Sequence, residues 1–148
     1  MKNISTHIAI AAPPKRVWRI LTDFVAYPEW NPFITFVSGL PEAGSTLNVR
    51  IVPPGGKAIT FKPVVLVARP NVELRWKGRL ILPGLFDGEH YFQLTTKQGG
   101  TVLTQGESFS GLLVGLLGSG VFIQTESGFA AMNAAIKHRA ENGPIPQL

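Results

Sequence analysis

His90 and Glu107 are the two side chains of this sequence whose types and positions best suit proton-transfer chemistry. They lie in two strand-like segments joined by Gln98-Gly99, a pair typical of a two-residue hairpin turn. Such a turn places His90 directly opposite Glu107, whereas a turn at Gly99-Gly100 would place Phe109 there instead. A carboxylate beside an imidazole could move a proton between substrate atoms, as in enolisation or aldol cyclisation. The pair could equally well satisfy its own hydrogen bonds or orient a ligand, so both roles stay open at this point.

The neighbours of this pair indicate that it faces the interior. Because side chains alternate along a strand, Phe92, Leu94, Leu103 and Gln105 share its face of the hairpin. Most of these neighbours are apolar, so the face should be buried. We therefore predict that the histidine and the glutamate lie together on a cavity wall, as candidate catalytic residues.

Aromatic side chains supply most of the other candidate ligand contacts. Trp76 alternates with charged neighbours and shares a strand face with Val72 and Leu74, so it should point inward, either as core or as a stacking surface. Trp30 lies in a proline-rich segment near the expected cavity mouth, where it could gate the cavity or anchor the packing. The predicted ligand contacts are Trp30, Phe33, Trp76, His90, Phe92, Gln105, Glu107, Phe109, Phe122 and Phe129.

Other catalytic and cofactor chemistries have no matching pattern. The sequence contains no cysteine and three scattered histidines, so we expect no thiolate nucleophile and no metal site. It has no Gly-x-Ser-x-Gly nucleophile elbow and no glycine motif that would hold a phosphate group. We predict no cofactor.

Strand patterns alternate with turn signals along most of the chain. Pro13-Pro14 suits the first turn of a helix after the first strand, and one further short helix fits before residue 33. From residue 112 the apolar spacing becomes helical, until Asn142-Gly143-Pro144 ends the helix. The short connections between the strands favour an antiparallel sheet. Strands are predicted over residues 4–11, 33–38, 46–52, 58–68, 72–82, 86–96 and 101–110.

The C-terminal helix is the only predicted element large enough to cover the apolar face of this sheet. A strongly curved sheet wrapped round one helix is not filled by that helix, so we predict a cavity of roughly a few hundred cubic ångströms. Glycines crowd the start of the helix, and each one inside a helix is destabilising. They could allow close packing against the sheet or form a flexible gate over the cavity. These glycines are Gly111, Gly115, Gly118, Gly120 and Gly128.

Length and composition limit the class of protein. The chain has 148 residues, of which 45% are hydrophobic and 16% charged, which predicts one globular domain over residues 1–148. The net charge is +5, but the basic residues are scattered, so no nucleic-acid partner is expected. The apolar run 112–123 is too short to span a bilayer, and residues 1–7 lack the apolar core of a secretory signal. We expect a cytoplasmic monomer or homodimer without stable membrane insertion.

Several segments, taken in order, resemble the START-like superfamily, also called SRPBCC. The resemblance implies an α+β helix-grip fold, in which a curved seven-stranded antiparallel sheet wraps round a long C-terminal helix and two short helices follow the first strand. It also implies a hydrophobic tunnel, as in Bet v-type plant allergens, lipid-transfer START domains and bacterial polyketide cyclase/dehydrase-like proteins. The segments are APPKRVWRILTD (12–23), YPEWNPF (27–33), LRWKG (74–78), GEHYF (88–92) and GTVLTQGESFSG (100–111).

Members of this superfamily differ in activity, so the fold does not fix the function. The first hypothesis is a carrier or sensor that binds a small hydrophobic ligand, such as a lipid, a polyketide or an aromatic compound. The alternative is a polyketide cyclase/dehydratase-type enzyme that uses His90 and Glu107 as acid and base. A third is a protein that docks on a partner or a membrane through the apolar segment 112–117.

Overall fold

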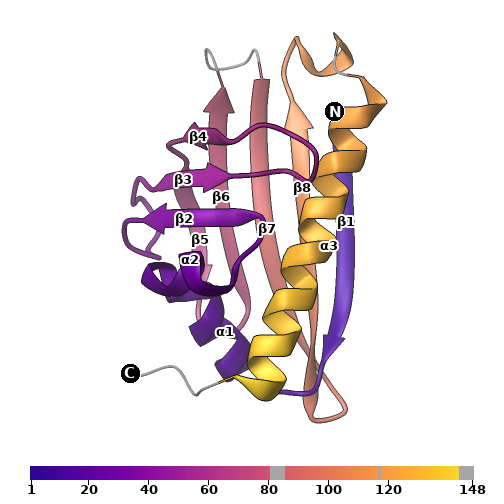
Figure 1. Cartoon of the computed structure of the whole chain (residues 1–148). Helices are drawn as coiled ribbons and strands as arrows, with labels where there is room; N and C mark the ends of the chain where they lie inside the picture. Colours follow the sequence, from indigo (N-terminus) through magenta and orange to yellow (C-terminus); the bar gives the residue numbers. More distant parts are fainter. Residues whose placement is uncertain (81–85, 117, 144–148) are drawn as a thin grey trace.

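The computed structural model describes residues 1–80, 86–116 and 118–143, with the side chains of Leu80 and Phe86 left out (Figure 1). Residues 81–82 of the predicted fifth strand and Pro144 of the predicted helix stop lie outside the described residues. In chain order the elements are β1 (Lys2–Ile10), α1 (Pro14–Thr22), η1 (Phe24–Ala26), α2 (Tyr27–Trp30), β2 (Ile34–Ser38), β3 (Asn48–Ile51), β4 (Ile59–Phe61), β5 (Val64–Arg69), β6 (Glu73–Leu80), β7 (Phe86–Lys97), β8 (Gly100–Ser110), η2 (Val114–Leu116) and α3 (Ser119–Asn142).

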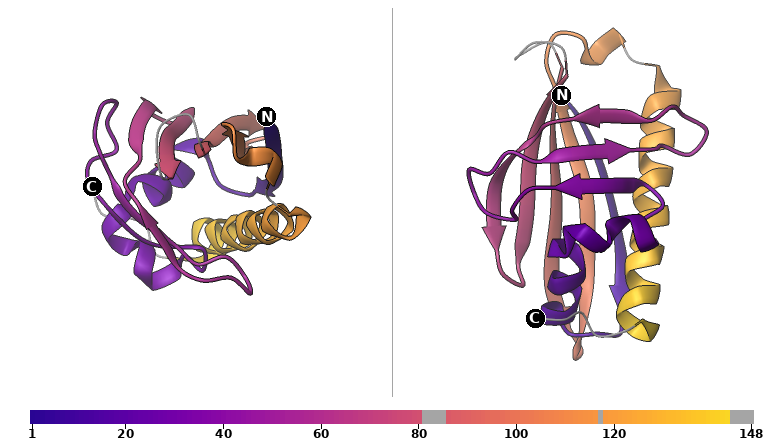
Figure 2. Two further views of the ribbon diagram at one scale, coloured as in Figure 1. Left: turned by 90° about the horizontal axis from the view of Figure 1, so that it is seen from above. Right: turned by 60° about the vertical axis from the view of Figure 1, so that its left-hand side comes forward.

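The strands form two antiparallel sheets that curve round α3. The first sheet has the order β1-β8-β7-β6-β5 and the second the order β2-β3-β4. The strands of the second sheet run across the long strands of the first, as Figure 2 shows. Seen from above, α3 lies across the opening between the edge strand β1 and the second sheet (Figure 2). The predicted α+β architecture, with a curved antiparallel sheet round a long C-terminal helix, is confirmed.

The strand count is eight among the described residues, where seven were predicted, because the predicted strand 58–68 is two strands. Pro63 separates them, since it has no N–H for a ladder hydrogen bond. Upstream of it β4 pairs with β3, and downstream β5 pairs with β6, so the chain changes sheet at this point. The two sheets stay joined here: the N–H of Leu47 donates to the Pro63 carbonyl oxygen at 2.8 Å, and that of Val65 to the Ser45 carbonyl oxygen at 2.9 Å.

The long helix begins at Ser119 and not at residue 112, and the short helix η2 precedes it. Gly128 in its third turn allows close packing, because a Cβ there would lie 2.3 Å from the ring of Phe33. At Gly115, Gly118 and Gly120 a Cβ would meet nothing within 4 Å, so close packing does not explain these glycines. The idea that this segment is a gate stays a prediction.

The short helices α1 and α2 close the lower end of the fold in Figure 1, beside the C-terminal end of α3. Arg16 on α1 donates hydrogen bonds to the carbonyl oxygens of Ala140 and Gly143 and so caps the last turn of α3. The Tyr27 hydroxyl donates to the Leu21 carbonyl oxygen at 2.6 Å. Burial, with a contribution from the charge of Asp23, raises the pKa of Tyr27 well above its usual range. This end is therefore packed, and the opposite end is where space remains.

Candidate functional site

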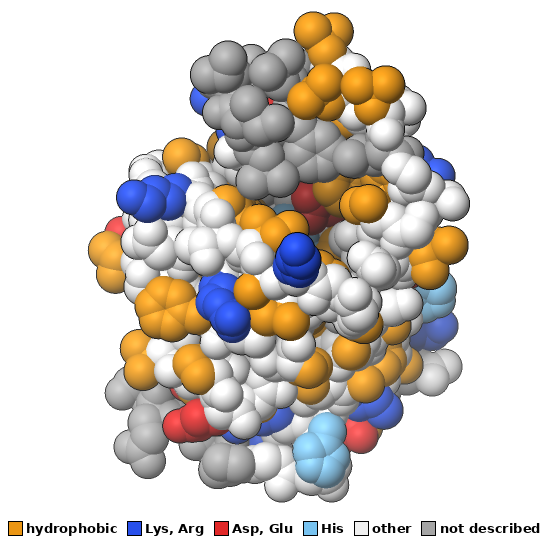
Figure 3. All heavy atoms as spheres, turned by 45° about the horizontal axis from the view of Figure 1, so that its top comes forward, with side chains coloured by type: hydrophobic (Ala, Val, Ile, Leu, Met, Phe, Trp, Pro, Cys, Tyr) orange, Lys and Arg blue, Asp and Glu red, His pale blue; other side chains and the backbone are white. Residues whose placement is uncertain are grey.

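A cavity of about 340 Å³ lies between the two sheets and the first turns of α3. This volume lies within the range predicted from the sequence and is typical of a small-molecule site. Figure 3 shows it as a hollow in the surface, with hydrophobic side chains and a basic side chain at its described edge and an acidic side chain inside. The described lining residues are Phe33, Ile34, Val49, Ile51, Pro53, Gly56, Lys57, Ile59, Phe61, Trp76, Gly78, Gly88, His90, Glu107, Phe109, Val121, Gln124 and Thr125.

The register of the β7–β8 hairpin places the candidate acid–base pair as predicted. Lys97 pairs with Gly100 across the turn, and His90 pairs with Glu107. The turn residues Gln98 and Gly99 have φ angles of 49° and 80°, the left-handed conformation that a tight two-residue hairpin turn needs at both positions.

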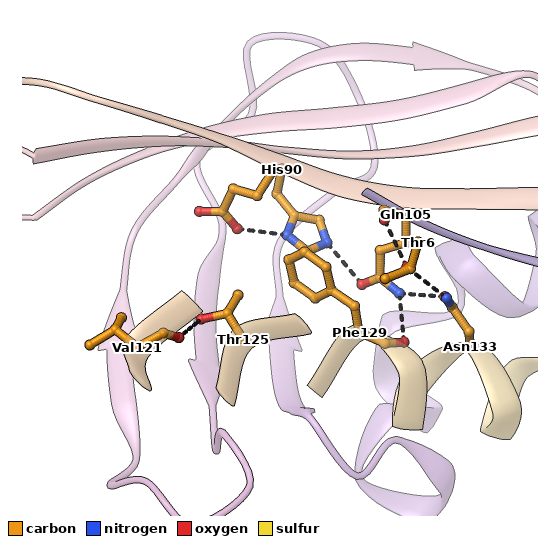
Figure 4. Close-up of polar contacts among 8 residues, drawn as sticks. Thr6, His90, Gln105, Val121, Thr125, Phe129 and Asn133 are labelled. Carbon is orange, nitrogen blue, oxygen red and sulfur yellow. Dashed lines mark hydrogen bonds and ion pairs between the residues drawn. The ribbon is translucent and has the colours of Figure 1, made fainter. Parts of the chain in front are cut away.

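The imidazole of His90 has a polar partner at each ring nitrogen and aromatic neighbours against its ring. Its Nδ1 lies 2.9 Å from Oε1 of Glu107, and its Nε2 lies 3.0 Å from Oε1 of Gln105 (Figure 4). The Trp76 ring stacks on the imidazole, with 5.3 Å between ring centroids and 16° between planes, and the Phe129 ring meets it edge-on at 4.9 Å. The His90 side chain is only 6% exposed, and that of Glu107 is 18% exposed. The imidazole is therefore fixed in orientation, while the glutamate keeps limited access to the cavity.

A chain of polar side chains continues from His90 into the core. Gln105 Nε2 donates to Asn133 Oδ1 at 2.6 Å, and Asn133 Nδ2 donates to the Thr6 hydroxyl at 2.8 Å (Figure 4). The Thr6 hydroxyl donates to the backbone carbonyl oxygen of Gln105 at 2.9 Å, which closes a ring of hydrogen bonds. Gln105 and Asn133 are fully or almost fully buried. Buried polar groups of this kind normally satisfy one another, and these do.

The second carboxylate oxygen of Glu107 differs from the first, because no described residue donates a hydrogen bond to it. A Cβ on Gly88 would lie 2.3 Å from this Oε2 atom, so only glycine leaves room for the carboxylate in its present position. Gly88 pairs with Gly78 across strands β7 and β6, and both glycines line the cavity. The cavity thus combines a mostly apolar lining with a carboxylate oxygen that receives no hydrogen bond from a described residue.

Half of the predicted ligand contacts line the cavity, and half do not. Phe33, Trp76, His90, Glu107 and Phe109 are lining residues. Trp30, Phe92, Gln105, Phe122 and Phe129 are not among the lining residues that the structure describes.

The predicted contacts outside the lining have other partners. Phe92 and Phe129 are fully buried around His90. Trp30 packs against Tyr27, with 5.1 Å between ring centroids. Phe122 packs against Phe109 at 5.4 Å and lines a separate surface pocket, where the Lys2 ammonium lies over its ring. A role in ligand binding for these residues stays a prediction.

Sequence reasoning missed most of the lining from the second sheet and from α3. Val49, Ile51 and Phe61 come from strands whose position over the cavity depends on long-range packing. The paired glycines were also missed, although they carried a signal: a glycine inside a strand pattern indicates that a ligand or another chain segment approaches closely.

Two kinds of feature are absent from the described residues: a cluster of metal ligands and a membrane-spanning helix. No group of three or more histidine, aspartate or glutamate side chains is arranged to hold a metal ion in residues 1–80, 86–116 and 118–143. In the same residues, no helix has both the length and the apolar character needed to span a membrane.

Comparison with known protein families assigns the chain to one of them. The family of polyketide cyclase / dehydrase and lipid transport proteins matches residues 1–141. The chain belongs to this family. Membership in the polyketide cyclase/dehydrase family confirms the START-like resemblance and supports a ligand-binding fold. Among curated proteins, none matches the chain significantly.

Solved structures show the same fold as this polyketide cyclase/dehydrase family member. Protein MLL2253 from Mesorhizobium loti is 21% identical with a TM-score of 0.74, covering 97% of this chain and 99% of its own. A START superfamily protein from Mycobacterium smegmatis is 22% identical with a TM-score of 0.73, covering 94% and 97%. The di-domain ARO/CYC BexL from the BE-7585A biosynthetic pathway is 20% identical with a TM-score of 0.74, covering 97% of this chain and 51% of BexL. These similarities establish the helix-grip fold.

Proposed function

We propose that this protein binds one small, largely apolar molecule in the cavity beside Trp76 and Glu107, as a carrier or sensor. The observation that carries the proposal is a 340 Å³ cavity with a predominantly apolar lining and a carboxylate oxygen that receives no hydrogen bond from a described residue. A cavity of this kind loses contacts when empty, and an apolar guest restores them. A cytoplasmic location suits such a role and is part of the same proposal.

Fluorescence of N-phenyl-1-naphthylamine, a neutral probe that brightens in apolar sites, tests this binding. We expect saturable binding of one probe molecule per chain. A linear, non-saturating rise up to the solubility limit of the probe would contradict the proposal.

An enzymatic role is the second candidate, favoured by the 2.9 Å contact between His90 and Glu107 at the wall of the cavity. Such a pair could remove and return a proton beside a carbonyl group. The apolar ketone 2-tetralone in D₂O gives a direct test, since enolisation replaces its α-protons by deuterium. A carrier should not accelerate this exchange beyond the rate in buffer.

For an enzyme, exchange should be accelerated and should slow by about a hundredfold or more in His90→Ala. His7→Ala is the matched control, because His7 is exposed on β1 and is not among the described lining residues of the cavity. The carrier interpretation also expects His90→Ala to keep most of its probe affinity. Circular dichroism of both variants checks that they remain folded.

A further inference from the structure

The hydrogen bonds behind the cavity wall have a fixed direction. The Thr6 hydroxyl donates its only proton to the backbone carbonyl oxygen of Gln105, and a carbonyl oxygen can only accept. The Thr6 oxygen must therefore accept a hydrogen bond from Asn133. This requires the Asn133 amide to point its nitrogen, and not its oxygen, at Thr6. The Asn133 oxygen then faces Gln105 and accepts from its Nε2.

A second carbonyl group fixes Gln105 in the same orientation. Nε2 of Gln105 also lies 3.4 Å from the backbone carbonyl oxygen of Phe129. Rotating the amide by half a turn would place its oxygen against this carbonyl and against the Asn133 oxygen. The Gln105 oxygen must therefore point at Nε2 of His90, 3.0 Å away, and this nitrogen must carry a proton.

The other ring nitrogen faces a carboxylate. Nδ1 of His90 lies 2.9 Å from Oε1 of Glu107, so one more proton is needed between these two atoms. Imidazole is a stronger base than a carboxylate, and the face of the stacked Trp76 ring favours a cation. We infer that Thr6, Asn133 and Gln105 hold His90 with an N–H on both nitrogens, so that Glu107 presents an ionised oxygen to the cavity.

This charge state defines the class of ligand, an inference that rests on the proposed function. Oε2 of Glu107 lies beside Gly88 in the cavity wall and receives no hydrogen bond from a described residue. A ligand that donates a hydroxyl or N–H proton to it completes the site, whereas a ligand carboxylate would be repelled. Lys57 also lines the cavity, but among the described residues the Glu107 carboxylate pairs with His90 and forms no ion pair with Lys57. The preferred ligand is a neutral apolar molecule with a hydrogen-bond donor.

The protonation of His90 is tested by nitrogen-15 NMR of its ring at neutral pH. We expect two protonated nitrogens, and a spectrum with one protonated nitrogen in the native protein would overturn the inference. In Gln105→Leu the acceptor at Nε2 is gone, so this nitrogen should lose its proton. Gln93→Leu is the matched control, because Gln93 bonds Glu73 and not the histidine, and it should leave the His90 signals unchanged.

The ligand class is tested by calorimetry with three molecules of one skeleton: 2-naphthol, 2-methoxynaphthalene and 2-naphthoate. We expect 2-naphthol, which has a donor, to bind at least about tenfold more tightly than the ether, and the anion to bind most weakly. Equal affinity of naphthol and ether, or tighter binding of naphthoate, would overturn the inference while leaving the proposed function intact. If N-phenyl-1-naphthylamine binds but 2-naphthol does not, the inference is overturned; the proposed function fails only if N-phenyl-1-naphthylamine does not bind either.

A pair of variants locates the source of this preference. Glu107→Leu should bind the naphthol and the ether equally, because the acceptor is removed. Glu126→Leu, which changes an exposed glutamate of α3 outside the cavity lining, should keep the preference of the native protein. A preference that survives in Glu107→Leu would show that another group selects the ligand and would overturn the inference.

Discussion

Replacing Gly78 by valine should weaken the binding of N-phenyl-1-naphthylamine by roughly tenfold to a hundredfold, while the protein remains folded. Gly78 lies in the cavity wall on the same strand face as Trp76, and a Cβ there would lie 2.9 Å from the ring of Phe61. The added side chain and the probe would compete for one space, and overpacking typically costs about 1–3 kcal/mol. Fluorescence titration measures the loss.

Gly120→Val is the matched control for this experiment. Gly120 lies in the first turn of α3, where a Cβ would meet nothing within 4 Å. The same side chain added there should leave the affinity unchanged, and it should not lower the melting temperature, since glycine is the weaker helix former. Unchanged affinity in Gly78→Val would show that the probe binds elsewhere.

The second large effect concerns stability. Gln105→Leu removes the acceptor of His90 Nε2 and the donor to Asn133 Oδ1, so two buried polar groups lose partners. Each such loss costs about 1–3 kcal/mol, which predicts a decrease of roughly 2–6 kcal/mol in the free energy of unfolding. Urea denaturation measures it. Gln93→Leu, which breaks one partly buried hydrogen bond to Glu73, should cost about 1 kcal/mol.

A double-mutant cycle separates this network from simple packing. If Gln105 and Asn133 stabilise the fold through each other, removing both should cost less than the two single losses added together, by about 0.5–3 kcal/mol. Additive losses in Gln105→Leu, Asn133→Leu and the double variant would contradict a coupled network. The double variant also replaces a polar pair by apolar groups of similar size, which is the more tolerated change.

The local chemistry of the sequence was enough to predict the central pair. Gln98-Gly99 suits only a narrow set of turns, and that turn sets the register that brings His90 and Glu107 together. The same reasoning failed at Pro63, where a long apolar run concealed a change from one sheet to the other. Local patterns specify strands and turns well, but they do not specify which sheet a strand joins.

Which residues lie behind the His90–Glu107 pair could not be predicted from local patterns, because it depends on how α3 is rotated about its axis against the sheet. Asn133 lies on the buried face of α3 with Phe129, Met132 and Ile136, and it meets Gln105 only because of that rotation. A polar residue on an apolar helix stripe was nevertheless a readable signal, since buried polar groups need partners. The lining from β2, β3 and β4 had no comparable signal, because it arises from strands that cross the long sheet.

The most direct test of the account is to locate a small molecule bound to the protein. Isotope-filtered nuclear Overhauser effects between bound 2-naphthol and the labelled protein would locate it. The account predicts contacts to Trp76, Ile34 and Val49 in the cavity wall. Saturable binding with contacts confined to the surface pocket of Phe122 and Ile123, or no contact with Trp76, would contradict it.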